Sequence, residues 1–391
     1  MSTVILLEIM LLASLSLIFL YQTLFALASF FSRKQSLSKP RIPTHRLAVI
    51  IPAHNEEMVI ERCLRAVLSA EYPQVLRDIW VVADNCTDGT VEKVGPHPVL
   101  LLERNDRKNV GKGYAILWAL ELIGLQTVDA VLFVDADAAV SQNILLEIDR
   151  VLARGEKVIQ VYNGTLNVEE NWMTRCFHFS DVFQFLVYFK GREALGLTSR
   201  LLGNGMCLHR EVLEKVPWRA FSITENWDYY FDVIRAGYRV AFTPSAYANS
   251  DQVVSFGQAK SQKSRWQTGW ASAVRNHVPS IIMQAWREKK LKLGDAVIDF
   301  LLPSPSMQGG FLALALIGAV FVGHGLLQSW SLLLLMLASI GGVVCLKVGG
   351  AGFRDCLAIF YAPLYITWKF LLRIALTVGS GPKEWVRTAR R

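Results

Sequence analysis

Two aspartates with one residue between them, Asp135 and Asp137, follow an apolar run that reads as a buried strand. Carboxylates with this spacing at a strand end can hold a divalent cation, and such a cation can bridge the phosphates of a diphosphate. The competing interpretation is an Asp-rich turn or a helix cap, which needs no ligand. Because the pair stands at the third of three similar strand ends, we favour the divalent metal over the turn.

Three short apolar runs in the middle of the chain have the composition of buried strands, and helical patterns separate them. Strands that alternate with helices predict a parallel sheet with right-handed crossovers. The strands are expected at 47–51, 79–83 and 130–134, and the helices at 56–70 and 113–123.

Each of these strands ends in polar residues. Residues 54–57 follow the first strand, 84–88 the second and 135–137 the third. Ligands of open α/β sheets bind outside the carboxyl ends of the strands. Three polar strand ends that converge on one edge are stronger support for a site than any single motif.

Lys112 stands between two glycines just before the second expected helix. Glycine lets a backbone approach a ligand closely, and a lysine can neutralise phosphate charge. The stretch lacks the glycine spacing of a P-loop, so the sequence does not support a nucleoside triphosphatase. Alone, this motif would more often be a surface turn.

The composition indicates a membrane protein. Apolar residues make up 52% of the 391 residues and charged ones only 19%, and the apolar excess lies in roughly the first 32 and the last 85 positions. The formal charge of +8 comes largely from basic residues beside these apolar ends, as in loops that face anionic lipid. We therefore expect membrane lipids, and no nucleic acid, as partners.

The first apolar segment, 4–31, is long enough to cross a hydrocarbon core about 30 Å thick. It is too long for a signal peptide and lacks the basic start of one. Basic residues follow it, which by the positive-inside rule places the middle of the chain in the cytosol. Six scattered cysteines form no CxxC pair, so neither disulfides nor a zinc site are expected.

At the other end, 309–327 and 330–346 read as a transmembrane hairpin. The apolar stretch 356–376 contains two basic residues, and a tail on the outer side would break the positive-inside rule, so we expect a tilted, re-entrant or interfacial segment. The expected organisation is a membrane helix at 1–32, a soluble α/β domain at 45–280, an interfacial amphipathic segment at 281–308, the hairpin at 309–350, and a membrane-associated or transmembrane segment with a basic cytosolic tail at 354–391.

Seven motifs occur in the order and spacing of the membrane-bound family 2 glycosyltransferases, the branch that contains cellulose, hyaluronan and chitin-oligosaccharide synthases. The chain resembles this family over nearly its whole length. The resemblance implies an α/β GT-A fold, Rossmann-like with a mostly parallel sheet, in a cytosolic domain flanked by transmembrane helices. The motifs are VIIPAHNEE (49–57), VVADNCTDGT (81–90), GKG (111–113), VDADA (134–138), GNGMCLHR (203–210), TENWDYYFDVIRAGYRV (224–240) and QKSRW (262–266), the last being the QxxRW motif of the branch.

The resemblance also implies roles for matching residues. Arg265 would offset charge on a leaving nucleoside diphosphate, and Trp266 would give a sugar a stacking platform. The alternative for this motif is the start of a basic amphipathic helix at the membrane surface. The nucleotide-sugar site would contain Pro52, Ala53, His54, Glu56, Asp84, Lys112, Asp135, Ala136 and Asp137; the acceptor site Gly203, Asn204, Gly205 and Trp266; and the catalytic set Glu225, Asp228, Gln262, Arg265 and Trp266.

One position departs from the family pattern. The family has Thr-Glu-Asp at 224–226, where the Asp takes the proton of the acceptor hydroxyl, and this chain has Asn226. An amide cannot accept that proton. Glu225 is the favoured substitute and Asp228 the second; the third possibility is an acceptor that is already an anion and needs no base.

The resemblance implies an inverting, metal-dependent hexosyltransferase that takes sugar from a nucleotide-sugar donor, most simply a UDP-sugar. It also implies that Asp135 and Asp137 hold Mg²⁺ or Mn²⁺ against the diphosphate. The acceptor would be lipid-linked or a polysaccharide, and polysaccharide-export proteins are possible partners. We expect an integral protein of a bacterial inner membrane. The alternative is a catalytically inactive subunit of a polysaccharide assembly or secretion complex, which rests on Asn226 alone.

Overall fold

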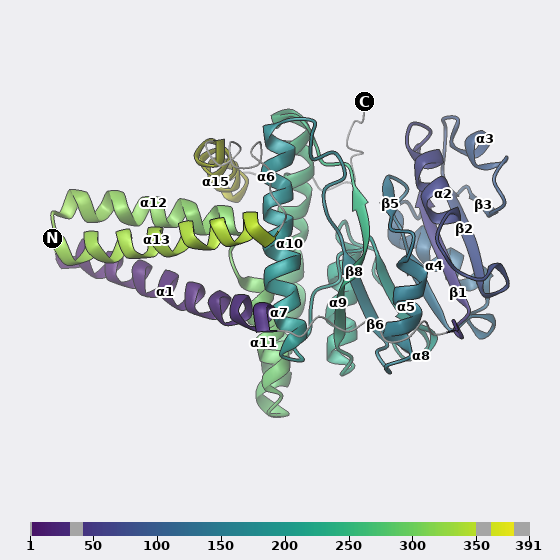
Figure 1. Ribbon diagram of the computed structural model, residues 1–391, viewed down its shortest axis with the longest axis horizontal. Coiled ribbons are helices and arrows are strands. Elements are labelled where there is room, and N and C mark those ends of the chain that lie inside the picture. Colours follow the sequence, from purple (N-terminus) through teal and green to yellow (C-terminus); the bar gives the residue numbers. More distant parts are fainter. Residues whose placement is uncertain (1, 32–41, 349–360, 379–391) are drawn as a thin grey trace. The chain divides into compact units, whose positions relative to one another are not determined.

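The computed structural model describes residues 2–31, 42–348 and 361–378. The chain forms two compact units (Figure 1). The sheet unit takes its described residues from 34–167 and 196–300, and the helical unit takes its own from 1–33, 168–195 and 301–380.

The sheet unit contains one mixed sheet of eight strands in the order β3-β2-β1-β4-β7-β6-β8-β5. The first four in this order run parallel, β7 pairs antiparallel with β4 and β6, and β5 pairs antiparallel with β8. The strands are β1 (Leu47–Ala53), β2 (Arg77–Asp84), β3 (Leu100–Arg104), β4 (Ala130–Phe133), β5 (Ala138–Val140), β6 (Val158–Tyr162), β7 (Met206–His209) and β8 (Val240–Ser250).

Apolar cores lie on both faces of the sheet. In β1, Ala48 and Ile50 belong to one core, and Leu47, Val49 and Ile51 to the other. Successive side chains of a strand point to opposite faces, so a run without polar residues is what burial on both faces requires. The helices of this unit are α2 (Ile60–Leu68), α3 (Thr90–Val94), α4 (Lys112–Ile123), α5 (Ile144–Leu152), α8 (Arg210–Lys215), α9 (Glu225–Arg235), α10 (Phe256–Arg287) and α11 (Leu291–Leu301).

The mostly parallel sheet confirms the predicted fold class, and β1, β2 and β4 lie where strands were expected. The strands β3, β5, β6, β7 and β8 were not predicted. The apolar residues of β3, at the edge of the sheet, are three leucines, which favour a helix as much as a strand.

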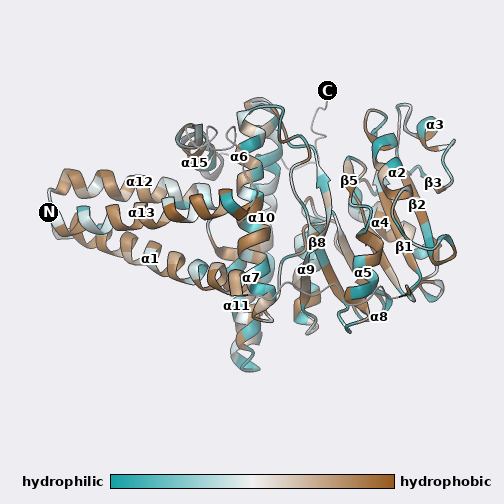
Figure 2. Ribbon diagram, in the orientation of Figure 1, coloured by the Kyte–Doolittle hydropathy of each residue, from teal (hydrophilic) through white to brown (hydrophobic). Residues whose placement is uncertain are grey.

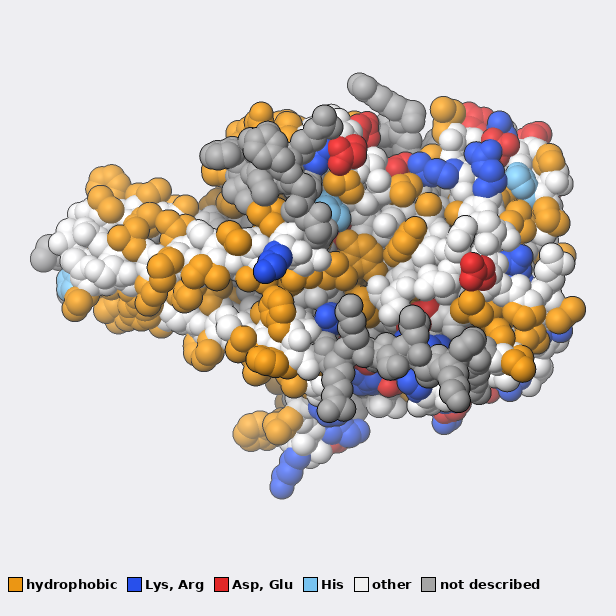
Figure 3. All heavy atoms as spheres, viewed as in Figure 1, with side chains coloured by type: hydrophobic (Ala, Val, Ile, Leu, Met, Phe, Trp, Pro, Cys, Tyr) orange, Lys and Arg blue, Asp and Glu red, His pale blue; other side chains and the backbone are white. Residues whose placement is uncertain are grey.

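The long helices of the helical unit are apolar, and Figure 2 shows them as mostly brown and Figure 3 with many hydrophobic side chains on their surfaces. Among the described residues, three helices of this unit are long and apolar enough to cross a membrane, over Thr3–Phe31, Pro305–Val322 and Gly325–Val348. The last two are consecutive along the chain, and Gly323 between them has a left-handed backbone. The expected transmembrane hairpin spans these two helices and stays a prediction. The helices of this unit are α1 (Ser2–Phe31), α6 (Trp172–Asp181), a π-helix (Val182–Phe189), α7 (Lys190–Ala194), α12 (Pro305–Val322), α13 (Gly325–Val348) and α15 (Ala362–Val378).

The stretch Val168–Leu195 groups with the apolar helices, although we expected a single soluble domain over 45–280. Arg192 is fully buried there, and its guanidinium donates a hydrogen bond of 2.9 Å to the Tyr21 hydroxyl and lies over the Phe25 ring. A Cβ on Gly191 would lie 2.0 Å from the Phe25 carbonyl oxygen, so α7 packs directly against α1.

The C-terminal apolar stretch forms α15, which packs on α12 through Phe370 and Phe311 and on α6 through Tyr365 and Phe177. The basic tail at 379–391 lies outside the described residues. The expected interfacial segment begins inside α10, which continues through Pro279 to Arg287, and ends in α12.

Gly113 offers a test of this packing. It lies in the first turn of α4, where a Cβ would stand 2.1 Å from the Ala220 carbonyl oxygen. The Trp218 indole also donates a 3.0 Å hydrogen bond to the Gly113 carbonyl oxygen, so neither side can withdraw. We expect Gly113→Ala to lower the free energy of unfolding by about 1–3 kcal/mol or more.

The matched control is Gly257→Ala in α10, where a Cβ meets nothing within 4 Å. Alanine there should leave stability unchanged or raise it by up to about 1 kcal/mol. Thermal unfolding of both variants in the same detergent measures the difference. Equal melting temperatures would contradict the close contact of α4 with the chain at Ala220.

Candidate functional site

The carboxyl ends of β1, β2 and β4 meet, as their sequence predicted. The ring Nδ1 of His54, just after β1, donates to the Asp84 carbonyl oxygen at the end of β2 over 2.6 Å. The Asn55 amide group and the Thr87 backbone bond across the same two loops. The loops after β1 and β2 therefore form one hydrogen-bonded surface.

Asp84 is the most buried acidic group at this edge, with an exposed fraction of 4%. Burial raises the pKa of its carboxyl, and the Arg104 guanidinium, 2.7 Å away, acts in the opposite direction. Arg104 also pairs with Asp106, which in turn receives the Lys108 and Asn109 backbone amides. Asp84 thus fixes the loop that leads to Gly111, and its predicted contact with the nucleotide base stays a prediction.

The Asp135–Asp137 turn is held at its backbone by side chains from other elements. The Asn204 side-chain oxygen accepts a 3.0 Å hydrogen bond from the Asp135 amide. The Arg62 guanidinium donates to the Asp137 carbonyl oxygen and pairs with Asp251, both at 2.7–2.8 Å. Asp137 is 8% exposed, whereas Asp135 has the more open side chain.

Lys112 joins the aspartate turn to a second acidic group. Its ammonium lies 2.5 Å from the Asp135 carboxylate and 3.6 Å from that of Glu225, the first residue of α9. Burial alone would lower the pKa of Lys112, but the charges of Asp135 and Glu225 outweigh it and raise that pKa. Lys112 therefore stays charged and holds the metal-site aspartate and the favoured base in one cluster.

Glu225 is nearly buried, and burial raises the pKa of its carboxyl while the Lys112 charge works against the rise. A carboxylate whose pKa lies above its usual range accepts a proton more readily than an exposed one. The geometry thus places the predicted base beside the predicted metal site.

Asn226 has a structural partner. Its side-chain nitrogen donates a 3.1 Å hydrogen bond to the Leu201 carbonyl oxygen. Gly203, two residues further along that loop, has a left-handed backbone, and a Cβ on it would lie 3.4 Å from the Lys112 ammonium and 3.6 Å from the Asn226 Cβ. The amide therefore ties the 201–205 loop to the start of α9, which a carboxylate could not do because it has no hydrogen to donate.

Two other predicted residues are engaged in ways the sequence did not indicate. Asn204, assigned to the acceptor, is 2% exposed and donates from its amide nitrogen to Asn163, to Ser250 and to the Ala248 carbonyl. It positions the aspartate turn, and the same loop leaves Gly203 and Gly205 buried. Asp228, the second candidate base, bonds instead to the His277 ring on α10 at 2.9 Å.

The three residues of the QxxRW motif lie in the first third of α10. The Gln262 side-chain oxygen is buried and has no hydrogen-bond partner among the described residues, so it is free for a ligand. Trp266 is 38% exposed, and the Lys263 ammonium lies 3.9 Å from its ring centroid and covers part of the predicted stacking platform. Further along the helix, Gly269 packs against the Thr224 side chain, next to Glu225, at a distance that leaves no room for a Cβ.

The aspartate pair suits a metal that arrives with its nucleotide. Within the described ranges no group of three His, Cys, Asp or Glu residues could hold an ion by itself. Mg²⁺ usually takes one or two carboxylates, substrate phosphates and water and not an all-protein cage. Asp135 and Asp137, with their backbone fixed and the Asp135 carboxylate open, fit that pattern.

Several residues of the site escaped sequence reasoning. Arg62, Arg104 and His277 each hold a candidate residue in place from an element that is distant in the chain. A single basic residue in a helix or strand gives no sign of its partner. Only the GNG motif around Asn204 carried a signal, and it pointed to a different role.

Asn226 can be tested by its hydrogen bond. We expect Asn226→Asp to lower stability by about 1–3 kcal/mol, because two acceptors would then face each other at Leu201. Asn226→Ala, which removes the donor without adding a charge, should cost less. Thermal unfolding ranks the variants. An Asn226→Asp variant that is as stable as the parent, and more active, would instead mean that the chain has lost its base.

Comparison with known proteins identifies the family of the chain and supports its fold. The family described as "Glycosyltransferase like family 2" matches residues 43–269. The beta-monoglucosyldiacylglycerol synthase of Nostoc sp. is 28% identical over 193 residues, which cover 47% of this chain and 40% of that protein. The protein of the same name from Synechocystis sp. is 24% identical over 282 residues, 70% of this chain and 58% of its own length. The chain thus spans about half the length of these relatives.

A solved structure supports the fold. The mannosyltransferase PcManGT from Pyrobaculum calidifontis, in complex with GDP-Man and Mn²⁺, matches with a TM-score of 0.52 at 18% identity, over 85% of this chain and 97% of that one. This similarity confirms the expected GT-A architecture. Since the family match covers more than half of its residues, the chain belongs to the Glycosyltransferase like family 2.

Proposed function

We propose that the protein is an inverting glycosyltransferase that moves a sugar from a nucleotide-sugar donor, most simply a UDP-sugar, to a lipid acceptor at the cytosolic face of a membrane. The observation that carries this proposal is the cluster in which Lys112 lies between Asp135 and Glu225. In this cluster, one lysine contacts both the aspartate that we propose as a metal ligand and the glutamate that we propose as the base.

On the donor side, Asp135 and Asp137 would hold Mg²⁺ or Mn²⁺, which supplies positive charge to the diphosphate when bound. Lys112 would turn from the two carboxylates toward the phosphates and add its own charge. Pro52, Ala53, His54, Glu56, Asp84 and Ala136 complete the proposed nucleotide-sugar site around the ends of β1, β2 and β4.

On the acceptor side, Glu225 would take the proton of an acceptor hydroxyl as its oxygen attacks the anomeric carbon. The bond between that carbon and the phosphate oxygen breaks, and the nucleoside diphosphate leaves with the electron pair. A single in-line displacement inverts the anomeric centre. Arg265 would offset the charge of the leaving group, the free Gln262 oxygen would bond a sugar hydroxyl, and Trp266 would stack against a sugar ring.

Two observations favour a lipid acceptor over a polysaccharide. Three helices among the described residues are long and apolar enough to cross a membrane, and the relatives from Nostoc sp. and Synechocystis sp. are beta-monoglucosyldiacylglycerol synthases by name. A bacterial inner membrane is the expected location, while membership of the QxxRW branch and contact with polysaccharide-export partners stay predictions.

The alternative of an inactive subunit depended on Asn226. The hydrogen bond of Asn226 to Leu201 gives this residue a structural reason, so it need not mark the loss of a catalytic group. The chain also retains the Asp135–Asp137 pair, Lys112 and the residues of the QxxRW motif.

The principal test is release of nucleoside diphosphate by the full chain in nanodiscs, with a panel of UDP- and GDP-sugars, Mn²⁺ or Mg²⁺, and diacylglycerol or native lipid extract as acceptor. We expect turnover with one donor, and its loss in Asp137→Ala. Glu225→Gln should lower kcat by about 10²–10⁴-fold, the usual contribution of a general base.

The matched control is Asp228→Asn, which keeps the helix and removes only the pair with His277. It should cost much less than Glu225→Gln. If Asp228→Asn abolishes turnover and Glu225→Gln does not, the assignment of the base is wrong. Failure of every donor with every acceptor would favour the inactive subunit.

The pH dependence gives a second test of Glu225. A general base acts in its ionised form, so kcat/KM should rise as the pH rises through the pKa of Glu225. Because burial raises that pKa, the rise should fall at a higher pH than for an exposed carboxylate. Glu225→Gln should flatten this limb of the profile. If the rise of kcat/KM with pH is unchanged in Glu225→Gln, another group is responsible for it.

A further inference from the structure

We propose that the corner where α10 meets α11 is a docking surface for the anionic headgroup layer of a lipid bilayer. This basic–aromatic corner comprises Ile282, Met283, Trp286, Arg287, Lys289, Lys290, Leu291 and Lys292. It lies outside the candidate active site, so its role holds whether or not the proposed transfer reaction is correct.

The corner exposes large apolar side chains that a water-facing helix end would not need. Trp286 is 84% exposed and Leu291 88%, and Ile282 and Met283 are each 51% exposed. Residues 282, 283 and 286 share one face of α10 because they are spaced at one and four positions. At the lower end of Figure 1, where the two helices join, Figure 3 shows hydrophobic and basic side chains together.

The helix after the corner has apolar residues on two faces. Leu293, Ala296, Val297 and Phe300 are buried in the core of the sheet unit. Leu291 and Ile298, seven positions apart, share another face and are exposed. Packing within the sheet unit therefore accounts for one apolar face of α11 and leaves the other without a partner among the described residues of that unit.

The charge of the corner matches an anionic layer. Residues 287–292 carry four basic side chains and one acidic one, which leaves a net charge of +3. Lys290 pairs with Glu288 at 2.6 Å, and Lys292 donates to the Gly196 carbonyl oxygen. No described carboxylate lies within ion-pair distance of Arg287 or Lys289, so these two charges are available to an external anion.

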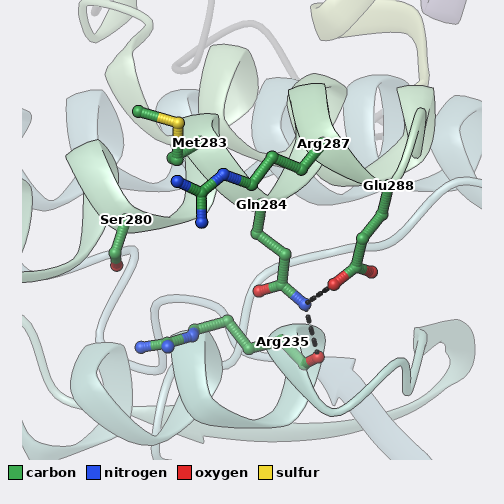
Figure 4. Close-up of a pocket in the computed structure, with 6 residues that line it drawn as sticks. All are labelled: Arg235, Ser280, Met283, Gln284, Arg287 and Glu288. Atoms are coloured by element: carbon green, nitrogen blue, oxygen red, sulfur yellow. Dashed lines mark hydrogen bonds between the residues drawn. The ribbon is translucent and has the colours of Figure 1, made fainter.

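A hollow of about 400 Å³ adjoins the corner and suits a phosphate group. Figure 4 shows Arg235 of α9 across from Arg287, Gln284 and Met283 of α10. The Gln284 side chain bonds to the Glu288 carboxylate and to the Arg235 carbonyl oxygen, which fixes the wall between the two arginines. Guanidinium groups form paired hydrogen bonds with phosphate oxygens.

The corner is preformed. Lys289 has a left-handed backbone with φ of 53°, and the Lys290 amide donates back to the Ala285 carbonyl oxygen at 3.0 Å. This bond closes the end of α10 and fixes the direction in which α11 leaves. Trp286 and Leu291 are therefore both exposed at this corner in the folded protein, and no change of fold is needed for them to meet a bilayer.

A bilayer fits these features better than an acidic protein or a second copy. Indole and leucine side chains enter the boundary between headgroups and acyl chains, and lysine and arginine bind anionic headgroups at the same level. The chain also carries helices able to cross a membrane, so a bilayer is the surface that it meets first.

The test places a spin label at Trp286→Cys in the full chain, reconstituted in nanodiscs of phosphatidylcholine with phosphatidylglycerol. The control is Val75→Cys, an apolar residue of the sheet unit that is 81% exposed, and the unsubstituted chain gives the background from native cysteines. We expect the label at 286 to be several-fold more accessible to oxygen, and less accessible to a water-soluble nickel reagent, than the label at 75.

The charge is tested in nanodiscs of phosphatidylcholine alone and with the double variant Arg287→Gln/Lys289→Gln, against Arg65→Gln/Lys93→Gln on α2 and α3. Loss of phosphatidylglycerol or of the two corner charges should expose the label at 286 to the nickel reagent, and the α2–α3 variant should not. Equal accessibility at 286 and 75 overturns the proposal. So does shielding that appears only when the protein concentration rises, which would assign the surface to a second copy. Neither readout needs turnover.

Discussion

The ion cluster of Lys112, Asp135 and Glu225 is the interaction on which the arrangement of the candidate site depends. Lys112 begins α4, Asp135 follows the end of β4 and Glu225 begins α9, so one ammonium joins three elements that are distant in the chain. A buried carboxylate next to another carboxylate is unfavourable unless a positive charge lies between them. The lysine supplies that charge. A bound metal with its diphosphate would change the charge around all three side chains.

Around this cluster, side chains from other elements bond to the backbone of the aspartate turn and of the neighbouring loop. Asn204 and Arg62 hold the aspartate turn, and Asn226 holds the loop that carries Gly203. Gly269 brings α10 against Thr224, so the helix with the QxxRW motif and the helix that starts at Glu225 meet at van der Waals distance. The site is therefore rigid on the side of the sheet.

The sequence predicted the sheet and the position of the site because buried parallel strands leave a strong apolar pattern and their polar ends follow at once. It missed β3 because the apolar residues of this edge strand are leucines, which carry no strand preference. It gave no sign of the contacts of Asn204 and Asp228, since side-chain partners such as Ser250 and His277 depend on tertiary packing and leave no local pattern. Asn226 shows this best: the sequence marks it as a missing carboxylate, and the fold uses it as a hydrogen-bond donor.

The segment Val168–Leu195 has a consequence for the order in which the chain folds. It leaves the sheet unit after Asn167 and returns at Gly196, so the strands β7 and β8 are synthesised only after it. Its buried Arg192 bonds to Tyr21 of α1, which the ribosome has already released, while Val182 and Val187 pack near Cys345 of α13, which emerges much later. The chain of the sheet unit is thus interrupted by a segment that packs with the apolar helices. A fragment cut at both ends to yield a soluble domain would still carry this anchor, stripped of its partners and prone to aggregate.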